Sequence, residues 1–336
     1  MKFKTAITEM FGVKYPIICG GMIWVGNPKL CAAVSNAGGL GTLTAGNYET
    51  EEEFRKAIEL TRKLTDYPFM VNITLLPSVR ITPEHHKMYV KVCNEERVSG
   101  IEFSGRSVDK ALGIEWIDRL KKGGIKIFQK VGSVRHALHA EKVGYDGIYA
   151  AGLEEGGHPL DDDVTTMVLT PRIVESVKIP VVAAGGMGNG RSLVAALALG
   201  AQGIMMATRF IATKESEVHE KIKQEFIQRQ EYETTLFGKT IGLQGRALKN
   251  KVIDEILAIE KKGGGLEEIL PLIHGKRIKE AWETGNIDSA PLMVGQSIGF
   301  IKDIPSCQEL IQRIIQEAFD QLTQINKMIS PNGRKR

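Results

Sequence analysis

Short apolar runs alternate along the first two thirds of the chain with longer amphipathic segments. Runs this short, bounded by glycine and polar residues, are typical of buried β-strands, whereas apolar residues at every third or fourth position are typical of surface helices. The pattern predicts strands within 15–19, 40–43, 69–73, 100–103, 125–130, 146–150, 181–184 and 200–210, and helices at 29–36, 51–63, 84–96, 115–122, 133–143 and 191–199.

Regular alternation of strands and helices predicts a parallel sheet. Eight repeats favour a closed (β/α)8 TIM barrel over a six-stranded open sheet. In such barrels, ligands meet the loops that follow the carboxyl ends of the strands. That rule places the following residues around one opening: Gly20, Gly21, Met22, Asn72, Lys130, His158, Gly185, Gly186 and Thr208.

The pattern changes after residue 214. Charged helical segments at 216–232 and 249–262 predict a helical insertion over 215–290, a lid domain beside the barrel mouth, while 1–214 and 291–330 form the barrel. The stretch 290–299 is apolar and glycine-spaced, so we expect it to return close to the ligand. An amphipathic helix over 307–328 is expected to pack on the barrel.

Composition supports an ordinary globular protein. Hydrophobic residues make up 43% and charged residues 25% of 336 residues, which is enough to bury a sizeable core. The formal net charge of +4 carries no dense basic stripe before the last three residues, so we expect no nucleic-acid partner. No apolar run approaches membrane-spanning length, and no signal segment is evident.

The four cysteines are scattered, and none shares zinc-ligand spacing with the seven histidines. We therefore expect reduced thiols, a cytoplasmic location and no bound metal.

Two consecutive glycine-type turns are candidates for a phosphate site. Gly185 and Gly186 follow one predicted strand, and Ala207 and Thr208 follow the next. Glycine permits close approach to a ligand, and the N–H groups that open a following helix favour an anion. Each turn taken alone also fits an ordinary strand end, but the two together favour a barrel's phosphate site.

His158, between Gly157 and Pro159, lies in a loop rather than on an apolar helix face. Its ordinary pKa near neutrality suits proton abstraction or support of an anion; the alternative is an exposed loop histidine. The neighbouring acids Glu154, Glu155 and Asp161–Asp163 are interpreted as a solvated loop rather than a metal site.

Two more polar side chains end or interrupt strands. Lys130 is placed to meet either an electron-rich flavin edge or a phosphate, with a solvent-facing lysine as the alternative. Asn72 is placed to hydrogen-bond a heteroaromatic ring, with an internal polar cap as the alternative. The chain has no G-x-S-x-G elbow, G-x-G-x-x-G turn or Walker lysine, which argues against serine hydrolysis and nucleotide-fingerprint folds.

Several segments together form a recognisable pattern: 20–25, 32–41, 68–73, 156–158, 183–186, Gly190, 207–210 and the Gly295–Gln296 pair. Through them the chain resembles the nitronate monooxygenase (2-nitropropane dioxygenase) family of FMN-dependent barrel flavoproteins over essentially its full length. NAD(P)H:quinone reductases and the flavin-dependent enoyl-acyl-carrier-protein reductase share the same frame, and the loop 75–77 looks like the quinone-reductase branch.

The resemblance implies non-covalent FMN. Its ring would lie near Gly21, Met22, Asn72 and Lys130, and Gly185, Gly186, Ala207 and Thr208 would hold its phosphate. Gly157 and Gln296 would complete the binding residues, and His158 would be catalytic. Three departures from the family pattern stand out: Ala207, where glycine is common; Cys19, where glutamine is common; and residues 104–107, where a Gly-Asn or Gly-Asp turn is more usual.

The expected activity is the oxidation of alkyl nitronates by O2 to a carbonyl compound and nitrite. The resemblance leaves open NAD(P)H-dependent reduction of a quinone or an enoyl thioester on the same barrel. A flavin-free barrel that binds a phosphorylated metabolite is a remoter alternative. In each case the partner is a small molecule, and the chain is a possible homodimer.

Overall fold

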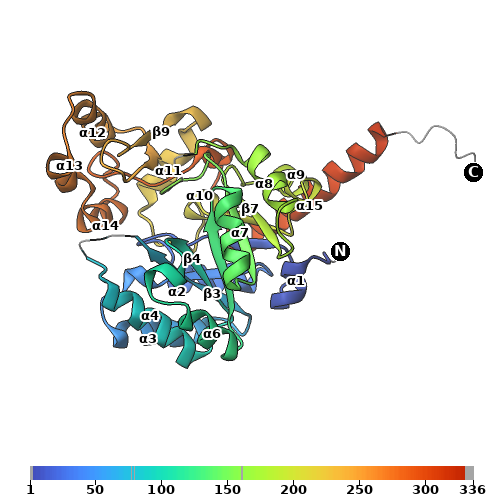
Figure 1. Cartoon of the computed structure of the whole chain (residues 1–336). Coiled ribbons are helices and arrows are strands. Elements are labelled where there is room, and N and C mark those ends of the chain that lie inside the picture. Colours follow the sequence, from blue (N-terminus) through green and yellow to red (C-terminus); the bar gives the residue numbers. More distant parts are fainter. Residues whose placement is uncertain (1–2, 77, 79, 160–161, 330–336) are drawn as a thin grey trace, which may run out of the picture.

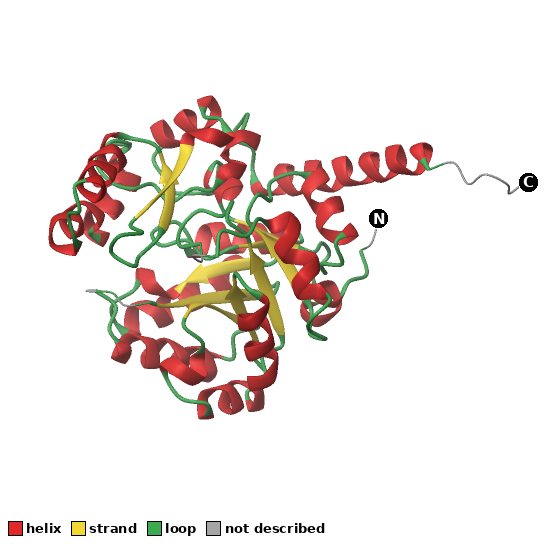
Figure 2. Ribbon diagram, turned by 45° about the horizontal axis from the view of Figure 1, so that its top comes forward, coloured by secondary structure: helices red, strands yellow, loops and turns green. Residues whose placement is uncertain are grey.

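The computed structural model describes residues 3–76, 78, 80–159 and 162–329, and eight parallel strands form its centre (Figures 1 and 2). The sheet order is β1-β8-β7-β6-β5-β4-β3-β2. A parallel bridge between Ile18 and Leu40 joins the two ends of this series, which closes the barrel and confirms the predicted fold. The strands are β1 Ile17–Cys19, β2 Gly41–Thr44, β3 Phe69–Leu75, β4 Gly100–Gly105, β5 Lys126–Val131, β6 Gly147–Ala151, β7 Val181–Ala184 and β8 Ile204–Met206.

Helices cover the outside of the barrel, as the sequence predicts. Side-chain caps define several of their starts: Thr50 and Glu53 form a capping box at α3, and Ser133 caps α7. The short α1, α5 and α8 were not predicted. The helices around the barrel are α1 Ala6–Phe11, α2 Pro28–Asn36, α3 Glu51–Leu64, α4 Pro83–Glu96, α5 Val108–Ala111, α6 Glu115–Lys122, α7 Val134–Val143, α8 Thr166–Val174, α9 Gly190–Ala198, α10 Thr208–Ile211 and α15 Cys307–Met328.

Apolar side chains fill the barrel's interior below the strands' carboxyl ends. Met70, Phe128 and Tyr149 are fully buried there, and Ile7 and Phe11 of α1 pack against the same cluster. With its apolar groups, helix α1 covers the end of the barrel at which the strands begin. The polar side chains lie at the other end, where the strands finish. The barrel thus has one polar opening, the place where ligands meet this fold.

The segment between α10 and α15 forms a second layer over one side of the barrel mouth (Figure 1). The expectation that it is purely helical is wrong, because β9 Thr234–Phe237 and β10 Gly245–Leu248 form an antiparallel pair. The expected helix over 216–232 is also shorter, α11 Glu220–Gln228. The pair packs on buried side chains of α12 Lys251–Lys261 and α13 Leu266–Ile273, and α14 Gly275–Thr284 follows. The division of the chain at 215–290 stays a prediction.

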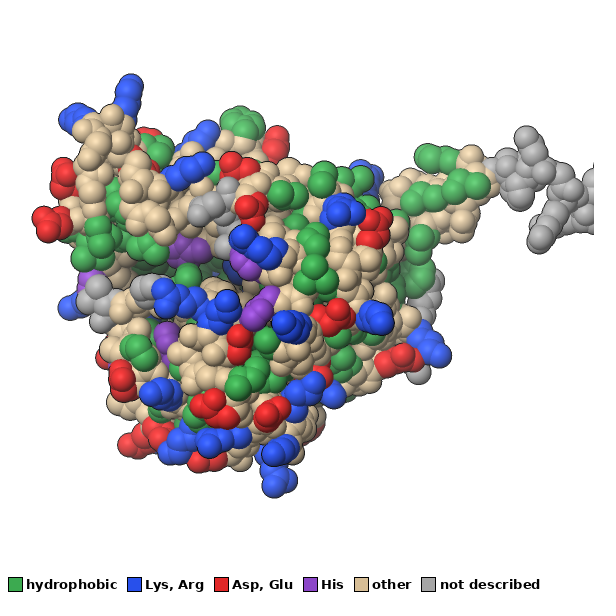
Figure 3. Space-filling view, in the orientation of Figure 1, with side chains coloured by type: hydrophobic (Ala, Val, Ile, Leu, Met, Phe, Trp, Pro, Cys, Tyr) green, Lys and Arg blue, Asp and Glu red, His purple; other side chains and the backbone are tan. Residues whose placement is uncertain are grey.

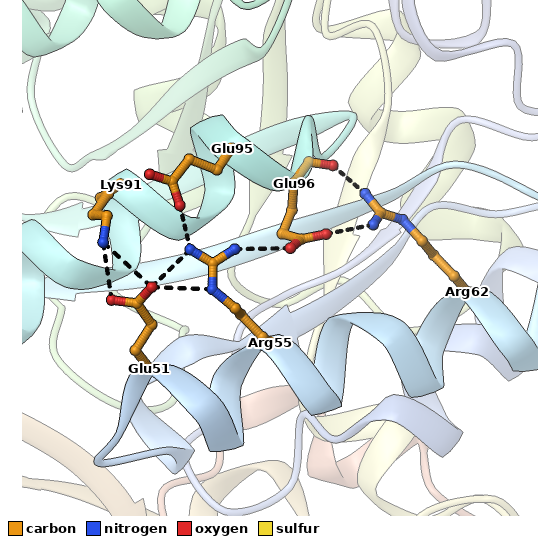
Figure 4. Close-up of polar contacts among 6 residues, drawn as sticks. All are labelled: Glu51, Arg55, Arg62, Lys91, Glu95 and Glu96. Carbon is orange, nitrogen blue, oxygen red and sulfur yellow. Dashed lines mark hydrogen bonds and ion pairs between the residues drawn. The ribbon is translucent and has the colours of Figure 1, made fainter.

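An ion-pair network joins α3 to α4 on the outer surface (Figure 4). Arg55 lies at its centre and contacts Glu51 at 2.7 Å, Glu96 at 2.8 Å and also Glu95. Lys91 reaches Glu51 at 3.1 Å, and Arg62 reaches Glu96 at 2.7 Å. All these charges belong to the outer helices, so the network has a structural role.

All four cysteines are buried, and none is bonded to another. Among the described residues, no helix is long and apolar enough to span a membrane.

Candidate functional site

The carboxyl ends of β1, β3 and β4 meet in a buried polar array. Gly21 lies so close to Asn72 that a Cβ on the glycine would come within 2.2 Å of the Asn72 Cγ. The Gly21 N–H donates to the Glu102 carboxylate at 3.2 Å, and Ser104 Oγ donates to the same carboxylate at 3.2 Å. Asn72 Nδ2 donates to Ser104 Oγ at 3.3 Å. Asn72 is therefore tied into the protein's own network and lies beside the β1 turn, as predicted.

Lys130 is largely shielded from solvent and pairs with Glu155 from the loop after β6. Its Nζ lies 3.0 and 3.1 Å from the two carboxylate oxygens, and the two side chains are only 18% and 11% exposed. Burial raises the pKa of the Glu155 carboxyl, and the Lys130 cation opposes that shift. Burial likewise raises the pKa of Glu102, again opposed by Lys130.

The interpretation of the acids after β6 as a solvated loop is wrong for Glu154 and Glu155. The Glu154 carboxylate accepts from the Thr166 N–H at 2.9 and 3.1 Å and from the Thr166 hydroxyl at 2.9 Å. Both carboxylates are bound by residues of neighbouring elements. The spacing of residues in the sequence does not reveal these contacts. Asp162 and Asp163 are exposed, as expected, and Asp161 lies outside the described residues. Among the described residues, no group of three or more histidine, cysteine or acidic side chains is arranged to hold a metal ion.

His158 is exposed, as the alternative for this loop residue expected, and it is bound by the loop between β9 and β10. Its Nδ1 lies 2.9 Å from the Gln244 carbonyl oxygen. A carbonyl only accepts, so the proton of the neutral ring lies on Nδ1 and Nε2 keeps its lone pair. Surrounding protein lowers the pKa of His158, with Lys130 adding to the shift and the Gln244 carbonyl opposing it. The neutral ring with a free Nε2 is suited to act as a base.

The same loop is joined to the insertion by backbone pairing. Gly157 and Arg246 exchange two hydrogen bonds, of 3.1 and 2.7 Å. The Arg246 guanidinium donates from Nε to the Leu153 carbonyl at 3.0 Å. Neither Gln244 nor Arg246 was predicted; the only available signal was the short apolar runs flanking Gly238 and Gly245.

Two adjacent strand ends present unpaired backbone donors. Gly185 and Gly186 have φ of 86° and 71°, which glycine adopts without strain. The backbone N–H groups of Gly186, Met187, Thr208 and Arg209 have no acceptor within the described part of the chain. β7 and β8 pair with each other in register at Ala184 and Met205, so the two groups of donors share one end of the barrel. This cluster of donors fits a phosphate.

The start of α9 is less open to an anion than its glycines suggest. Glu317 of α15 already accepts from the Gly190 N–H at 2.8 Å, and Asn189 accepts from the Ser192 N–H at 2.9 Å. An anion therefore has free donors at the β7 turn itself and at the start of the short α10, whereas the first N–H of α9 is already bound.

The stretch 290–299 returns to the site, as predicted. The Gly295 N–H donates to the buried Thr208 hydroxyl at 2.9 Å, and the Gln296 N–H donates to the Glu154 carbonyl at 3.0 Å. A Cβ on Gly156 would lie 2.5 Å from the Val294 carbonyl carbon, so the two backbones touch. This contact brings the Glu154–His158 loop, the β8 turn and the return segment into one wall.

The surface is hollowed between the insertion and the barrel, and basic and histidine side chains line its edges (Figure 3). Trp24, from the turn after β1, lies at the junction with φ of 67°, a conformation that an L-residue rarely adopts. The Arg80 guanidinium carbon lies 4.4 Å from its ring centroid, and Lys279 Nζ of α14 lies 5.3 Å away. One ring thus carries a cation from the segment after β3 and another from α14 of the insertion.

Comparison with known proteins agrees with this geometry. A protein-family model described as nitronate monooxygenase matches residues 4–317. A probable nitronate monooxygenase from Staphylococcus saprophyticus is 33% identical over 95% of this chain and 98% of its own. An octahydro-indene-carboxyl-CoA dehydrogenase from Rhodococcus jostii is 31% identical over 95% of this chain and 97% of its own. The solved structure of FabK from Thermotoga maritima is 34% identical, covers 98% of this chain and all of its own, and superposes with a TM-score of 0.89.

Proposed function

The chain belongs to the nitronate monooxygenase family and is an oxidoreductase, and we propose that it binds FMN and oxidises alkyl nitronates with O2 to a carbonyl compound and nitrite. The observation that carries this proposal is the rim itself. A neutral histidine, a buried lysine and two sets of free backbone donors meet at the carboxyl ends of consecutive barrel strands.

The residues present fit FMN. The free N–H groups after β7 and β8 suit its phosphate, with Gly185, Gly186, Ala207 and Thr208 as the holding residues. Gly21, Met22, Asn72 and Lys130 would border the ring, with Gly157 and Gln296 alongside. Bound FMN would supply the electron acceptor that this set of side chains lacks. Ala207 adds one methyl group to the expected cradle, and its backbone leaves the neighbouring Thr208 N–H free.

The chain's own residues would handle the proton and the charge. With its Nδ1 proton bound by Gln244, His158 presents Nε2 as a base, which suits abstraction of the α-proton of a neutral nitroalkane. Of the two roles expected for this residue, the lowered pKa favours this one, because the ring stays unprotonated at neutral pH. Lys130 would place positive charge beside the ring, where negative charge gathers on reduction.

The test is His158→Asn in FMN-loaded protein. We expect turnover of neutral nitroalkane to fall about 100-fold or more, the scale of general-base catalysis, while the yellow spectrum and FMN affinity persist. Turnover of preformed nitronate should fall far less, because no proton has to be removed. Unchanged nitroalkane turnover would remove His158 from the mechanism, and a colourless protein that takes up no FMN would refute the proposal and favour a flavin-free barrel.

A second candidate, NAD(P)H-dependent reduction of an enoyl thioester or a quinone, has an observation of its own. Arg80 and Lys279 both lie on the Trp24 ring where the barrel meets the insertion, a combination that suits a large substrate with a planar base and phosphates. The likeness to FabK and to the CoA-thioester dehydrogenase is in keeping with it. Anaerobic mixing with NADH, NADPH or propionate 3-nitronate separates the candidates: bleaching of the flavin by the nucleotide alone would favour the reductase, and bleaching by the nitronate alone the oxidase.

A further inference from the structure

Three charged side chains, Glu102, Lys130 and Glu155, lie buried together at the carboxyl end of the barrel. Both carboxylate oxygens of Glu155 accept from Lys130 Nζ, whereas the Glu102 carboxylate accepts from the Gly21 N–H and the Ser104 hydroxyl. Lys130 is thus the single cation between two carboxylates, and its direct partner is Glu155. A pair this well buried is screened little by solvent, so its charges act on whatever lies beside them.

The Glu155 backbone is closely confined. A Cβ on Gly185 would come within 3.2 Å of the Glu155 nitrogen, and one on Gly295 within 3.0 Å of its carbonyl carbon. The β7 turn therefore borders the residue on one side and the return segment on the other. The Glu155 backbone is therefore held between these two segments, and its side chain reaches Lys130 from that fixed position.

We propose that Glu155 is a positioning residue that sets how much of the Lys130 positive charge acts on the flavin, and thereby sets the flavin's reduction potential. This inference rests on the proposed FMN binding. Reduction of the ring by two electrons and one proton adds one negative charge to it. Because the Glu155 carboxylate offsets the charge of Lys130, the lysine stabilises the negative charge of the reduced flavin less than it would without Glu155. The native ion pair therefore keeps the flavin's reduction potential lower than Lys130 alone would.

The test is the potential of bound FMN, measured by anaerobic photoreduction against a reference dye at pH 7. Glu155→Gln keeps the side chain's size and removes its charge. We expect the ratio of reduced to oxidised flavin at a fixed potential to rise at least tenfold, which is about 30 mV for a two-electron couple. Glu155→Asp keeps the charge and should stay nearer the native value.

A double-mutant cycle decides whether Glu155 acts through Lys130. In a Lys130→Met protein, the buried Glu155 has lost its cation and should be protonated, so adding Glu155→Gln should change the ratio less than threefold. The matched control is Glu154→Gln, a neighbouring carboxylate bound to Thr166 instead, which should also change the ratio less than threefold. Melting curves of each variant confirm that the fold is intact.

An unchanged potential in Glu155→Gln, or an equal shift with and without Lys130, would overturn the inference. The measurement needs no substrate, so a shift in a protein inactive on nitronates supports the inference while refuting the proposed reaction. The reverse outcome, nitronate turnover with no shift, refutes the inference alone. A protein that binds no FMN refutes both.

Discussion

The contact between Gly156 and the return segment makes a sharp prediction for Gly156→Ala. The new Cβ would lie 2.5 Å from the Val294 carbonyl carbon and 2.6 Å from the Gly295 nitrogen, whereas ordinary contact begins at 3.4 Å. The two backbones must therefore part by about 0.9 Å (3.4 minus 2.5). The Gln296 N–H to Glu154 carbonyl bond, now 3.0 Å, would then stretch beyond hydrogen-bond range.

The cost follows from those contacts. One or two lost hydrogen bonds at about 1 kcal/mol each and overpacking of about 1–3 kcal/mol give a destabilisation of roughly 2–5 kcal/mol. Because the displaced wall carries Glu155 and His158, FMN affinity and turnover should fall with stability. Differential scanning fluorimetry with and without FMN, together with a fluorescence titration of FMN, measures both effects.

Gly265→Ala is the matched control. Gly265 lies in the insertion with φ of −114°, and a Cβ there has no atom within 4 Å. The same methyl addition should therefore cost less than about 1 kcal/mol and leave FMN binding intact. Equal melting temperatures and equal FMN affinities for the two variants would refute the reasoning, because they would show that the loop after β6 and the return segment are not in contact.

Three further perturbations test other parts of the molecule. Thr208→Ala leaves the buried Gly295 N–H without an acceptor and should lower the free energy of unfolding by about 1–3 kcal/mol. Thr208→Ser keeps the hydroxyl and should retain most of that stability. Equal denaturation midpoints for the two variants would contradict the contact. Desolvation by the surrounding protein lowers the pKa of the exposed His158 side chain below its ordinary 6.5. The acid limb of kcat/KM for a neutral nitroalkane should therefore lie below pH 6.5, and an acid limb centred above 6.5 would contradict the lowered pKa. Arg55→Leu should lower the melting temperature at low salt, and the difference from wild type should shrink in 1 M NaCl because the network is partly exposed; a salt-independent difference would point to packing instead.

Local pattern was enough to predict the barrel and most of its elements. The helix expected over 115–122 has those bounds, and the one expected over 307–328 also agrees. Strands such as 181–184 were predicted correctly because a short apolar run that ends in glycine is typical of a buried strand. The candidate rim followed from the same pattern, because parallel strands present all their carboxyl ends on one side.

The errors lie where a residue's environment is supplied by a distant part of the chain. Glu154 and Glu155 have the composition of a solvated loop, and they are drawn away from solvent because Thr166 and Lys130 bind their carboxylates. The strands at 234–237 and 245–248 are each four residues long and half polar, so their pairing depends on the surface beneath them. The glycines before α9 suggested an anion site at that helix, but Glu317 already accepts from its first N–H.

The sequence by itself therefore determined the barrel, the order of its strands and the set of polar residues at their ends, because these depend on periodicity and on glycine placement within a few neighbouring residues. Only the tertiary structure decided the hydrogen-bond partner of His158, the ion-pair partner of Lys130 and the confinement of the loop after β6. Gln244 lies 86 positions from His158, and Glu155 lies 25 positions from Lys130. Charge and proton affinity depend on such through-space neighbours, and no local pattern specifies which ones will meet.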